Sequence, residues 1–404
     1  MLAAQTGSDA IARMLESNHK DLFGDFLPFI ERYVIDRDYG GFLCDTDFDG
    51  TRADTNKSAV YEGRGMWVYS FLYVHFGRRE EYLDVARRSA ALVRKSEPRD
   101  GGFWSTRLNR DGTPDGPLAT NMAGDLAVAE GLAAYARATK SQEHLDWAAR
   151  LLKRSVEAYD REDYNPGAGR TFIGPEAPLT PGARNVGSWM LLLRCASEIR
   201  EADKEPWLNA IIDRAIEAVM DRHFNPAYRL NNEILPHDLG RPSGPFAQLA
   251  YPGHTFEISW MLLEEAMARG DTALFNTVAE RFQRHADVAW DAIYGGVFHN
   301  LRNVDGNRWV LDKVLWAQEE VLITALLIWA QTKAAWARDL FDRVNGYVRE
   351  KYPLTNHGSP LWMYATDRKA TFEAFARMPK RIEHYHHPRH LMKNYLRLEQ
   401  LQKI

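Results

Sequence analysis

The strongest constraint on the fold is a turn-rich segment that recurs about every sixty residues. In its clearest copies a glycine pair leads, eight or nine residues on, to Asp-Gly, which is a hairpin signal because glycine tolerates positive φ. The steps between successive starts are 63, 61, 61, 70 and 58 residues, so six units fill the chain. Clear copies begin at Asp36, Arg99 and Asp291, and weaker copies begin at Asp160, Asp221 and Arg349.

Between these turns, apolar residues recur with the i, i+3, i+4, i+7 spacing of amphipathic helices. Six pairs of helices that cannot bury their apolar faces alone are best satisfied by closing into a ring. The sequence therefore predicts an all-α fold, an (α/α)6 barrel with short β-hairpins in its connecting loops, as one catalytic domain over 1–404; an open solenoid is the rival. The expected helices cover 10–35, 58–76, 80–96, 120–138, 142–159, 185–200, 206–222, 254–269, 272–290, 314–332, 334–350 and 384–401.

Composition and charge narrow the class of protein. Hydrophobic residues make up 45%, charged residues 26%, and the formal net charge is -4, which is the balance of a soluble globular chain and not of a strongly basic nucleic-acid binder. Cys44 and Cys195 are the two cysteines, so no disulfide framework and no CxxC motif is expected. The longest apolar run, 321–330, is too short to span a bilayer. We expect a cytoplasmic protein without nucleic-acid or membrane partners, and the sequence leaves a homodimer open.

The helix that follows each turn carries polar and aromatic side chains on a face that should be buried. If these helices form the inner ring, their first turns converge on one cavity, where charged groups need partners or a polar ligand. The side chains concerned are Arg64 and Trp67, His254 and Glu257, Trp316 and Glu320, and His386 and Arg389.

Two segments are richest in such groups. In Pro252-Gly253-His254-Thr255-Phe256-Glu257 the histidine falls in the first helical turn, and Glu257 can orient it or share its proton; a capped helix start with a solvated His–Glu pair is the plain alternative. The segment 383–390 is rich in histidine, but Pro388 interrupts its helical spacing and no HExxH motif accompanies it. We therefore expect no metal there, and a surface histidine cluster is the alternative.

Arg64 lies among apolar residues, which favours a buried guanidinium that donates to a substrate oxygen or a developing oxyanion; pairing with Glu62 on a helix surface is the alternative. Trp67 and Trp316 are either core residues or platforms for a sugar ring. No glycine-rich turn has the GxGxxG or GxxxxGK[ST] form, so no nucleotide fold and no cofactor is expected.

Together these residues resemble the N-acylglucosamine 2-epimerase superfamily, which includes cellobiose 2-epimerases and mannose/glucose aldose–ketose isomerases. Residues 64–70 are similar to its Arg-x-x-Trp-x-(Phe/Tyr)-Ser, residues 252–260 to its Pro-Gly-His-x-x-Glu-x-x-Trp, and residues 385–389 to its Tyr-His-x-Pro-Arg. Residues 313–320 resemble Lys-x-Trp-Trp-x-Gln-x-Glu, with Glu320 as the carboxylate and Leu315 in place of one tryptophan. Asn185 and Trp189 stand where many members carry Asn-x-x-x-His.

The resemblance covers nearly the whole chain and implies an isomerase of carbohydrate metabolism that acts on a free reducing sugar of the N-acylglucosamine or mannose/glucose type. A proton leaves C2 to give a cis-enediolate; its return to the opposite face of C2 gives the epimer, and its return to C1 gives the ketose. The implied acid–base pair is His254 and His386, with Glu257 tuning His254. Arg64 is implied as the group that stabilises the oxygen charge. The implied substrate contacts are Trp67, Asn185, Trp316, Glu320 and Arg389.

Two other classes of function remain open on the sequence. An (α/α)6 glycoside hydrolase or lyase would use paired carboxylates, here drawn from Asp125, Glu257 and Glu320, and would release two sugars from a glycoside. A non-catalytic sugar- or protein-binding barrel would bind its ligand without exchange of the C2 proton.

Overall fold

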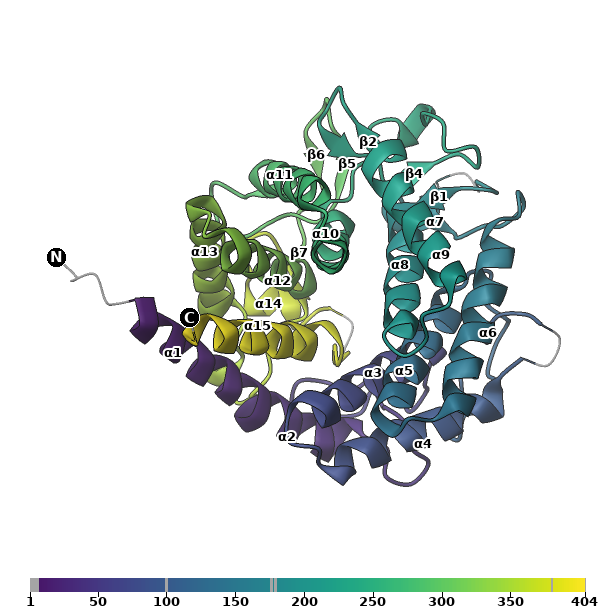
Figure 1. The fold of residues 1–404 in the computed structure, drawn as a ribbon. Coiled ribbons are helices and arrows are strands. Elements are labelled where there is room, and N and C mark those ends of the chain that lie inside the picture. Colours follow the sequence, from purple (N-terminus) through teal and green to yellow (C-terminus); the bar gives the residue numbers. More distant parts are fainter. Residues whose placement is uncertain (1–6, 99–100, 175–176, 178–179, 379–380, 404) are drawn as a thin grey trace.

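The computed structural model describes residues 7–98, 101–174, 177, 180–378 and 381–403, so Arg99 and Asp100, which open the second turn segment, lie outside the described residues. In this part of the chain six long helices form an inner ring, and a second layer of helices packs outside it (Figure 1). The inner helices are α3 (Ala59–His75), α5 (Ala123–Thr139), α8 (Val186–Arg200), α10 (Pro252–Arg269), α12 (Leu315–Thr332) and α15 (His386–Gln402). The outer helices are α1 (Gly7–His19) with its continuation, α4 (Glu80–Ser96), α6 (Gln142–Tyr159), α9 (Pro206–Glu217), α11 (Thr272–Ala289) and α13 (Ala335–Lys351).

The ring is closed. Each inner helix contacts the next in chain order, and the last, α15, contacts the first, α3. The outer helix α1 packs on α15, so the two ends of the described chain lie side by side (Figure 1). Each of the twelve predicted helices has its counterpart in the structure, and the predicted (α/α)6 barrel is confirmed over the open solenoid.

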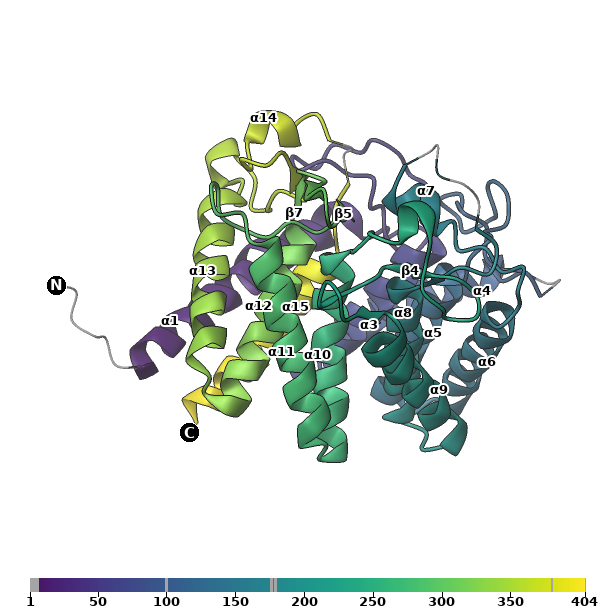
Figure 2. The same cartoon turned by 90° about the horizontal axis from the view of Figure 1, so that it is seen from above.

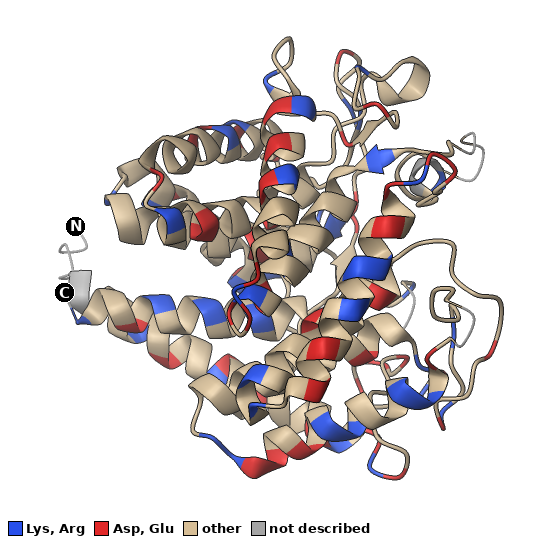
Figure 3. Ribbon diagram, turned by 45° about the vertical axis from the view of Figure 1, so that its right-hand side comes forward, with Lys and Arg blue, Asp and Glu red and all other residues tan. Residues whose placement is uncertain are grey.

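Burial distinguishes the two layers. The inner helix α12 buries side chains on every side from Leu315 to Ile328, because its neighbours in the ring and the outer helix cover it all round. The outer helix α11 buries one stripe that includes Phe275, Val278 and Phe282, as the i, i+3, i+7 spacing predicts. Charged residues of both signs are interspersed along the helices (Figure 3). Among the helices of the described residues, none combines the length and the apolar character needed to cross a bilayer.

The first outer helix is not a regular α-helix throughout. It continues from α1 through η1 (Lys20–Phe26), α2 (Leu27–Phe29) and η2 (Ile30–Val34), of which η1 and η2 have π geometry. Pro28 lies between the two wide segments and has no N–H to donate to the preceding turn. The chain accommodates it by widening the helix and so stays helical over the predicted length.

Short strands and helical turns gather at one end of the ring, which Figure 2 shows at the top. In the described residues the strands form four separate antiparallel pairs, β1–β4, β2–β3, β5–β6 and β7–β8, and no closed sheet. In the predicted hairpin at Asp305-Gly306 the left-handed residue is Asn307, with φ 48°, and not the glycine. The remaining elements are α7 (Ala168–Phe172), β1 (Arg184–Asn185), η3 (Ala218–Arg222), β2 (Phe224–Asn225), β3 (Leu230–Asn231), β4 (Ile234–Leu235), η4 (Gly244–Phe246), β5 (Leu301–Asn303), β6 (Arg308–Trp309), β7 (Lys313–Val314), η5 (Thr355–His357), β8 (Ala365–Thr366) and α14 (Phe372–Phe375).

Two of the turn segments are each fixed by a buried aspartate–lysine ion pair of the same kind. In the first, Lys57 Nζ lies 3.0 Å from Asp36 Oδ2 and donates to the Gly40 carbonyl, and Arg110 binds both oxygens of Asp36. The fifth segment repeats the arrangement with Asp291, Lys313, Gly295 and Arg368. The glycine pair at each turn has positive φ, which a side chain would disfavour. The repeated pattern of an aspartate followed four residues later by a glycine pair therefore has a structural role at the mouth of the barrel.

Candidate active site

A cavity of about 350 Å³ lies at the loop-bearing end of the inner ring. Its lining includes residues from the N-terminal halves of α3, α5, α8, α10 and α15 and from the start of α12. The predicted site residues that line it are Arg64, Asn185, His254, Glu257, Trp316 and His386. The structure therefore brings together, in one cavity, the two histidines that lie 132 positions apart in the sequence (386 minus 254).

His254 lies in the first turn of α10, and its partner is a carboxylate that the sequence did not suggest. Its Nδ1 is 2.9 Å from Oε1 of Glu233, which is 1% exposed and reaches the ring from the residue before β4. No other hydrogen bond engages the imidazole within the described residues, so Nε2 is available to a ligand. Burial alone would lower the pKa of His254, but the charge and hydrogen bond of Glu233 raise it above the ordinary histidine value.

His386 is the first residue of α15, and both of its ring nitrogens are buried without a hydrogen bond. Nε2 lies 3.6 Å from Oε1 of Glu257, and Nδ1 lies 3.9 Å from Oε2 of Glu383. Burial lowers the pKa of His386 to about 3, and Arg389 adds to this effect against the two carboxylates. This imidazole is therefore neutral near pH 7, and its nitrogens make no hydrogen bond that a substrate would need to displace among the described residues.

Trp316 lies close to both histidines. Its ring centroid is 6.3 Å from that of His254 and 5.5 Å from that of His386. Two glycines make room for this arrangement: a Cβ on Gly253 would lie 2.7 Å from the Trp316 ring, and a Cβ on Gly187 would lie 2.7 Å from Cε1 of His254. Side chains at either position would push an aromatic ring out of place.

Arg64 and Asn185 complete the set of predicted residues in the cavity. The Arg64 guanidinium lies over the ring of Tyr385, 4.9 Å from its centroid, and its Nε has no hydrogen-bond partner in the described residues. It does not pair with Glu62, which is fully buried and accepts a hydrogen bond from the Phe42 N–H. Asn185 immediately precedes α8.

The comparisons with known proteins identify the family of this chain. The sequence model of the family described as N-acylglucosamine 2-epimerase (GlcNAc 2-epimerase) matches residues 40–388, which is most of the chain. The chain belongs to the N-acylglucosamine 2-epimerase family. It is therefore an enzyme of the isomerase class.

Individual relatives are similar to this chain in sequence, and solved structures are similar to it in fold. The bovine (Bos taurus) N-acylglucosamine 2-epimerase is 26% identical over 336 residues, which cover 80% of this chain and 77% of the relative. The solved cellobiose 2-epimerase of Spirochaeta thermophila DSM 6192 superposes with a TM-score of 0.81 at 18% identity, covering 98% of this chain and 99% of that chain. A solved D-mannose isomerase gives a TM-score of 0.75 at 16% identity, covering 99% and 100%. These two structural likenesses show the shared fold.

Glu257 faces His386 rather than His254, which differs from the tuning role that the sequence suggested. Arg389 Nη2 lies 2.7 Å from its Oε1, and Arg194 Nη1 lies 3.2 Å from the same oxygen. Burial would raise the pKa of Glu257, but Arg389, His386 and Arg194 together hold it below its ordinary value. The hydrogen-bond partner of His254 is Glu233, and Glu257 adds only a weaker electrostatic contribution to its pKa.

Three of the predicted substrate contacts do not line the cavity. Arg389 and Glu320 are fully buried beneath it, where Arg389 binds Glu320 and Glu257, and Trp260 Nε1 donates to Glu320 at 2.7 Å. Burial and the neighbouring Glu257 raise the pKa of Glu320. Trp67 lines a second cavity, on the far side of this buried network, and its Nε1 donates to Glu198 at 3.1 Å.

Sequence reasoning missed two acidic residues of the site. Glu383 lines the cavity, caps α15 by accepting from the N–H groups of Tyr385 and His386, and pairs with Arg381. It begins the histidine-rich segment that the sequence singled out, so a signal for it existed. Glu233 had none, because its contact with His254 depends on how the β3–β4 segment folds over α8.

Two groups of buried side chains have ligand atoms close enough to hold a cation. In one, His387 Nδ1 and His390 Nδ1 lie 2.5 Å and 3.1 Å from Glu319 Oε1. In the other, Arg389 contacts both Glu257 and Glu320, next to His386. Glu319 Oε2 in the first group and both ring nitrogens of His386 in the second are buried without a hydrogen-bond partner among the described residues.

Proposed function

We propose that the enzyme removes and returns the C2 proton of a free reducing sugar, through a cis-enediolate, and so interconverts C2 epimers or an aldose and its ketose. The observation that carries the proposal is that His254 and His386 line one cavity while His386 has no hydrogen-bond partner in the described residues. A two-base mechanism needs one imidazole neutral and the other protonated in the resting enzyme. The opposite pKa shifts of the two histidines favour that state.

In the proposed first step, neutral His386 takes the proton from C2 of the open-chain aldose. The electron pair of the C–H bond forms the C1–C2 double bond, and the C1 carbonyl oxygen takes the negative charge. Protonated His254 then gives its proton to the opposite face of C2, which inverts that centre and restores the C1 carbonyl. If the proton is delivered to C1 instead, the O2 hydroxyl gives its proton to O1 as C2 becomes the carbonyl carbon, and the product is the 2-ketose.

Two features of the cavity would stabilise the enediolate. Arg64 offers an unpartnered donor, and one well-placed donor to a developing oxyanion contributes about 3 kcal/mol. The N-termini of the inner helices also point at this end of the ring, and a helix N-terminus favours negative charge. Trp316, whose ring is close to both histidines, would present that ring to the sugar.

The residues buried beneath the cavity would not contact the sugar, and they would act by positioning residues that line the cavity. We assign Arg389 and Glu320 to holding Glu257 beside His386, and Trp67 to packing in the inner ring, where it stacks on Phe71. The hydrolase alternative finds less support, because Asp125 does not line the cavity and is bound by Arg154.

Incubation with a panel of reducing sugars in deuterated water, read by NMR, tests the proposal. We expect deuterium at C2 with a new aldose for an epimerase, and at C1 with a ketose for an isomerase. His254→Asn and His386→Asn should each lose product formation by about a thousandfold, the size of a general acid–base contribution. His19→Asn, an exposed histidine on α1, is the matched control and should behave as the wild type. Product formation unchanged in both site variants would refute the assignment.

A further inference from the structure

We propose that an aromatic pocket beside the catalytic cavity receives a benzene-sized apolar substituent of the substrate, and that Leu315 sets the size of this pocket. The inference rests on the proposed function, because it names the kind of sugar that the same site would take.

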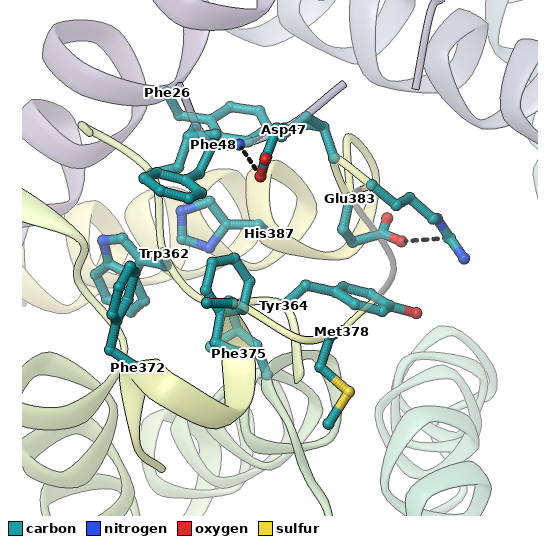
Figure 4. A pocket seen from close by; sticks show the side chains of 15 residues that line it. Phe26, Asp47, Phe48, Trp362, Tyr364, Phe372, Phe375, Met378, Glu383 and His387 are labelled. Atoms are coloured by element: carbon teal, nitrogen blue, oxygen red, sulfur yellow. Dashed lines mark hydrogen bonds and ion pairs between the residues drawn. The ribbon is translucent and has the colours of Figure 1, made fainter. Parts of the chain in front are cut away.

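The pocket is small and rich in aromatic side chains. Its volume is about 140 Å³, and Figure 4 shows its side chains arranged around a central space. An apolar cavity of about 150 Å³ in a protein accepts benzene, so this pocket has room for a group of that size. The aromatic walls are Phe26, Phe48, Trp362, Tyr364, Phe372 and Phe375.

The pocket adjoins the catalytic cavity. Tyr364, Arg381 and Glu383 line both spaces, so the two spaces adjoin at these side chains. At the starts of α12 and α15, consecutive residues line the pocket and the cavity. Leu315 lines the pocket while Trp316 lines the cavity, and His387 lines the pocket while His386 lines the cavity. A substituent on a sugar held between the catalytic histidines therefore has the pocket as its nearest apolar space.

The pocket also offers a polar contact. His387 Nδ1 is held by Glu319 Oε1 at 2.5 Å, and within the described residues no hydrogen bond engages its Nε2. Aromatic and apolar walls with a few polar groups, here His387, Asp47, Arg381 and Glu383, are the usual composition of a small-molecule site. They suit an apolar group attached through an amide or ether, such as an arylacyl or benzyl group, better than another hydroxyl-bearing sugar ring.

Leu315 lines the pocket at a position where this sequence differs from the family pattern. It is 4% exposed, lines the pocket, and stands where the resembling pattern has the first of two tryptophans. An indole in place of the isobutyl group would occupy space that the pocket now leaves open. We infer that this leucine is what makes the pocket available to a substituent.

The experiment compares sugars with and without a benzene-sized group. We would measure kcat/KM for C2 exchange and, by calorimetry, the dissociation constant of N-phenylacetyl-D-glucosamine against N-acetyl-D-glucosamine, and of 4-O-benzyl- and 6-O-benzyl-D-glucose against D-glucose. The wild type should favour at least one aryl sugar over its parent by about tenfold, the scale of filling an apolar pocket.

Two variants fill the pocket from different sides. Leu315→Trp and, at the pocket wall, Ala376→Leu should each abolish the preference while leaving the parent sugar within about twofold. Ala273→Leu, on the exposed face of α11, is the matched control and should keep the preference. Because the two variants are independent, misfolding of one leaves the other as the test.

The outcomes separate the two proposals. No preference for any aryl sugar in binding or turnover, or a preference that survives both filling variants, would overturn the pocket assignment even if C2 exchange occurs. Tighter binding of an aryl sugar that both variants abolish, without C2 exchange of any sugar, would keep the pocket and refute the proposed function.

Discussion

Nδ1 of His254 lies 2.9 Å from Oε1 of Glu233, a buried residue 21 positions earlier that immediately precedes β4. This contact fixes the imidazole so that Nε2 is the nitrogen left for a ligand. It also stabilises the protonated ring, which is the form that the proposed mechanism needs as the proton donor.

Glu233→Gln should therefore weaken the acid. Glu233 raises the pKa of His254, so removal of the Glu233 charge lowers that pKa. As the pH rises, the variant histidine therefore loses its proton at a lower pH than the wild-type histidine does. We expect the alkaline limb of kcat/KM to move to lower pH and the activity at pH 8 to fall by about 100-fold. A pH profile of C2 exchange checks this, and an alkaline limb that stays in place would contradict the role of Glu233.

Single-histidine variants should reveal which face of C2 each imidazole serves. With His254→Asn, the remaining His386 can still remove the C2 proton from the epimer whose hydrogen faces it, so weak residual deuterium exchange should be confined to that epimer. His386→Asn should show the complementary preference. The measurement is NMR of each purified epimer in deuterated water. Residual exchange of the same epimer in both variants would indicate a single base.

Gly187→Ala tests the close approach of α8 to His254. A Cβ at this position would lie 2.7 Å from Cε1 and 3.0 Å from Nδ1 of the imidazole, so the ring must move and its contact with Glu233 weakens. We expect kcat/KM to fall at least about tenfold with a thermal midpoint close to that of the wild type. Gly346→Ala on α13 is the control, because no atom lies within 4 Å of its Cβ position. Equal activity of the two variants would show that the approach does not matter.

The fold could be predicted from the sequence because each clear turn segment contains the residues that stabilise it. Asp36 and Asp291 each organise a turn through a buried lysine, and the period of these turns sets the number of helix pairs. The two histidines were also predictable, because each falls in the first turn of an inner helix.

The depth of side chains along the barrel axis was not predictable. Trp67, Glu320 and Arg389 share a helix face with Arg64, Trp316 and His386, but each lies one turn further along. One helical turn rises about 5 Å along the helix axis, so a side chain one turn further along can lie beyond the end of the cavity. Periodicity identifies the face of a helix and contains no information on where a cavity ends.

The buried turn of Asp36 should matter for stability, with a defined pH dependence. Burial would raise the pKa of Asp36, but Arg110 and Lys57 lower it to about 2, below the ordinary value of about 3.9. A carboxylate with a lowered folded-state pKa contributes stability that is fully present above its unfolded pKa and is lost as the pH falls toward the folded one. The contribution should therefore be complete above about pH 5 and fade between about pH 4 and pH 2.

Asp36→Asn should lower the free energy of unfolding by about 3 kcal/mol at pH 7, because it leaves the buried Lys57 ammonium without its counter-ion. The difference from the wild type should narrow as the pH falls below 4, since the wild-type carboxyl then loses its charge as well. Urea unfolding at pH 7 and pH 3 measures both values. Asp38→Asn is the matched control: its side chain is 72% exposed and pairs with the same Arg110, so its loss should cost less than about 1 kcal/mol. Equal destabilisation by the two substitutions would mean that burial of the Asp36 pair is not what stabilises the turn.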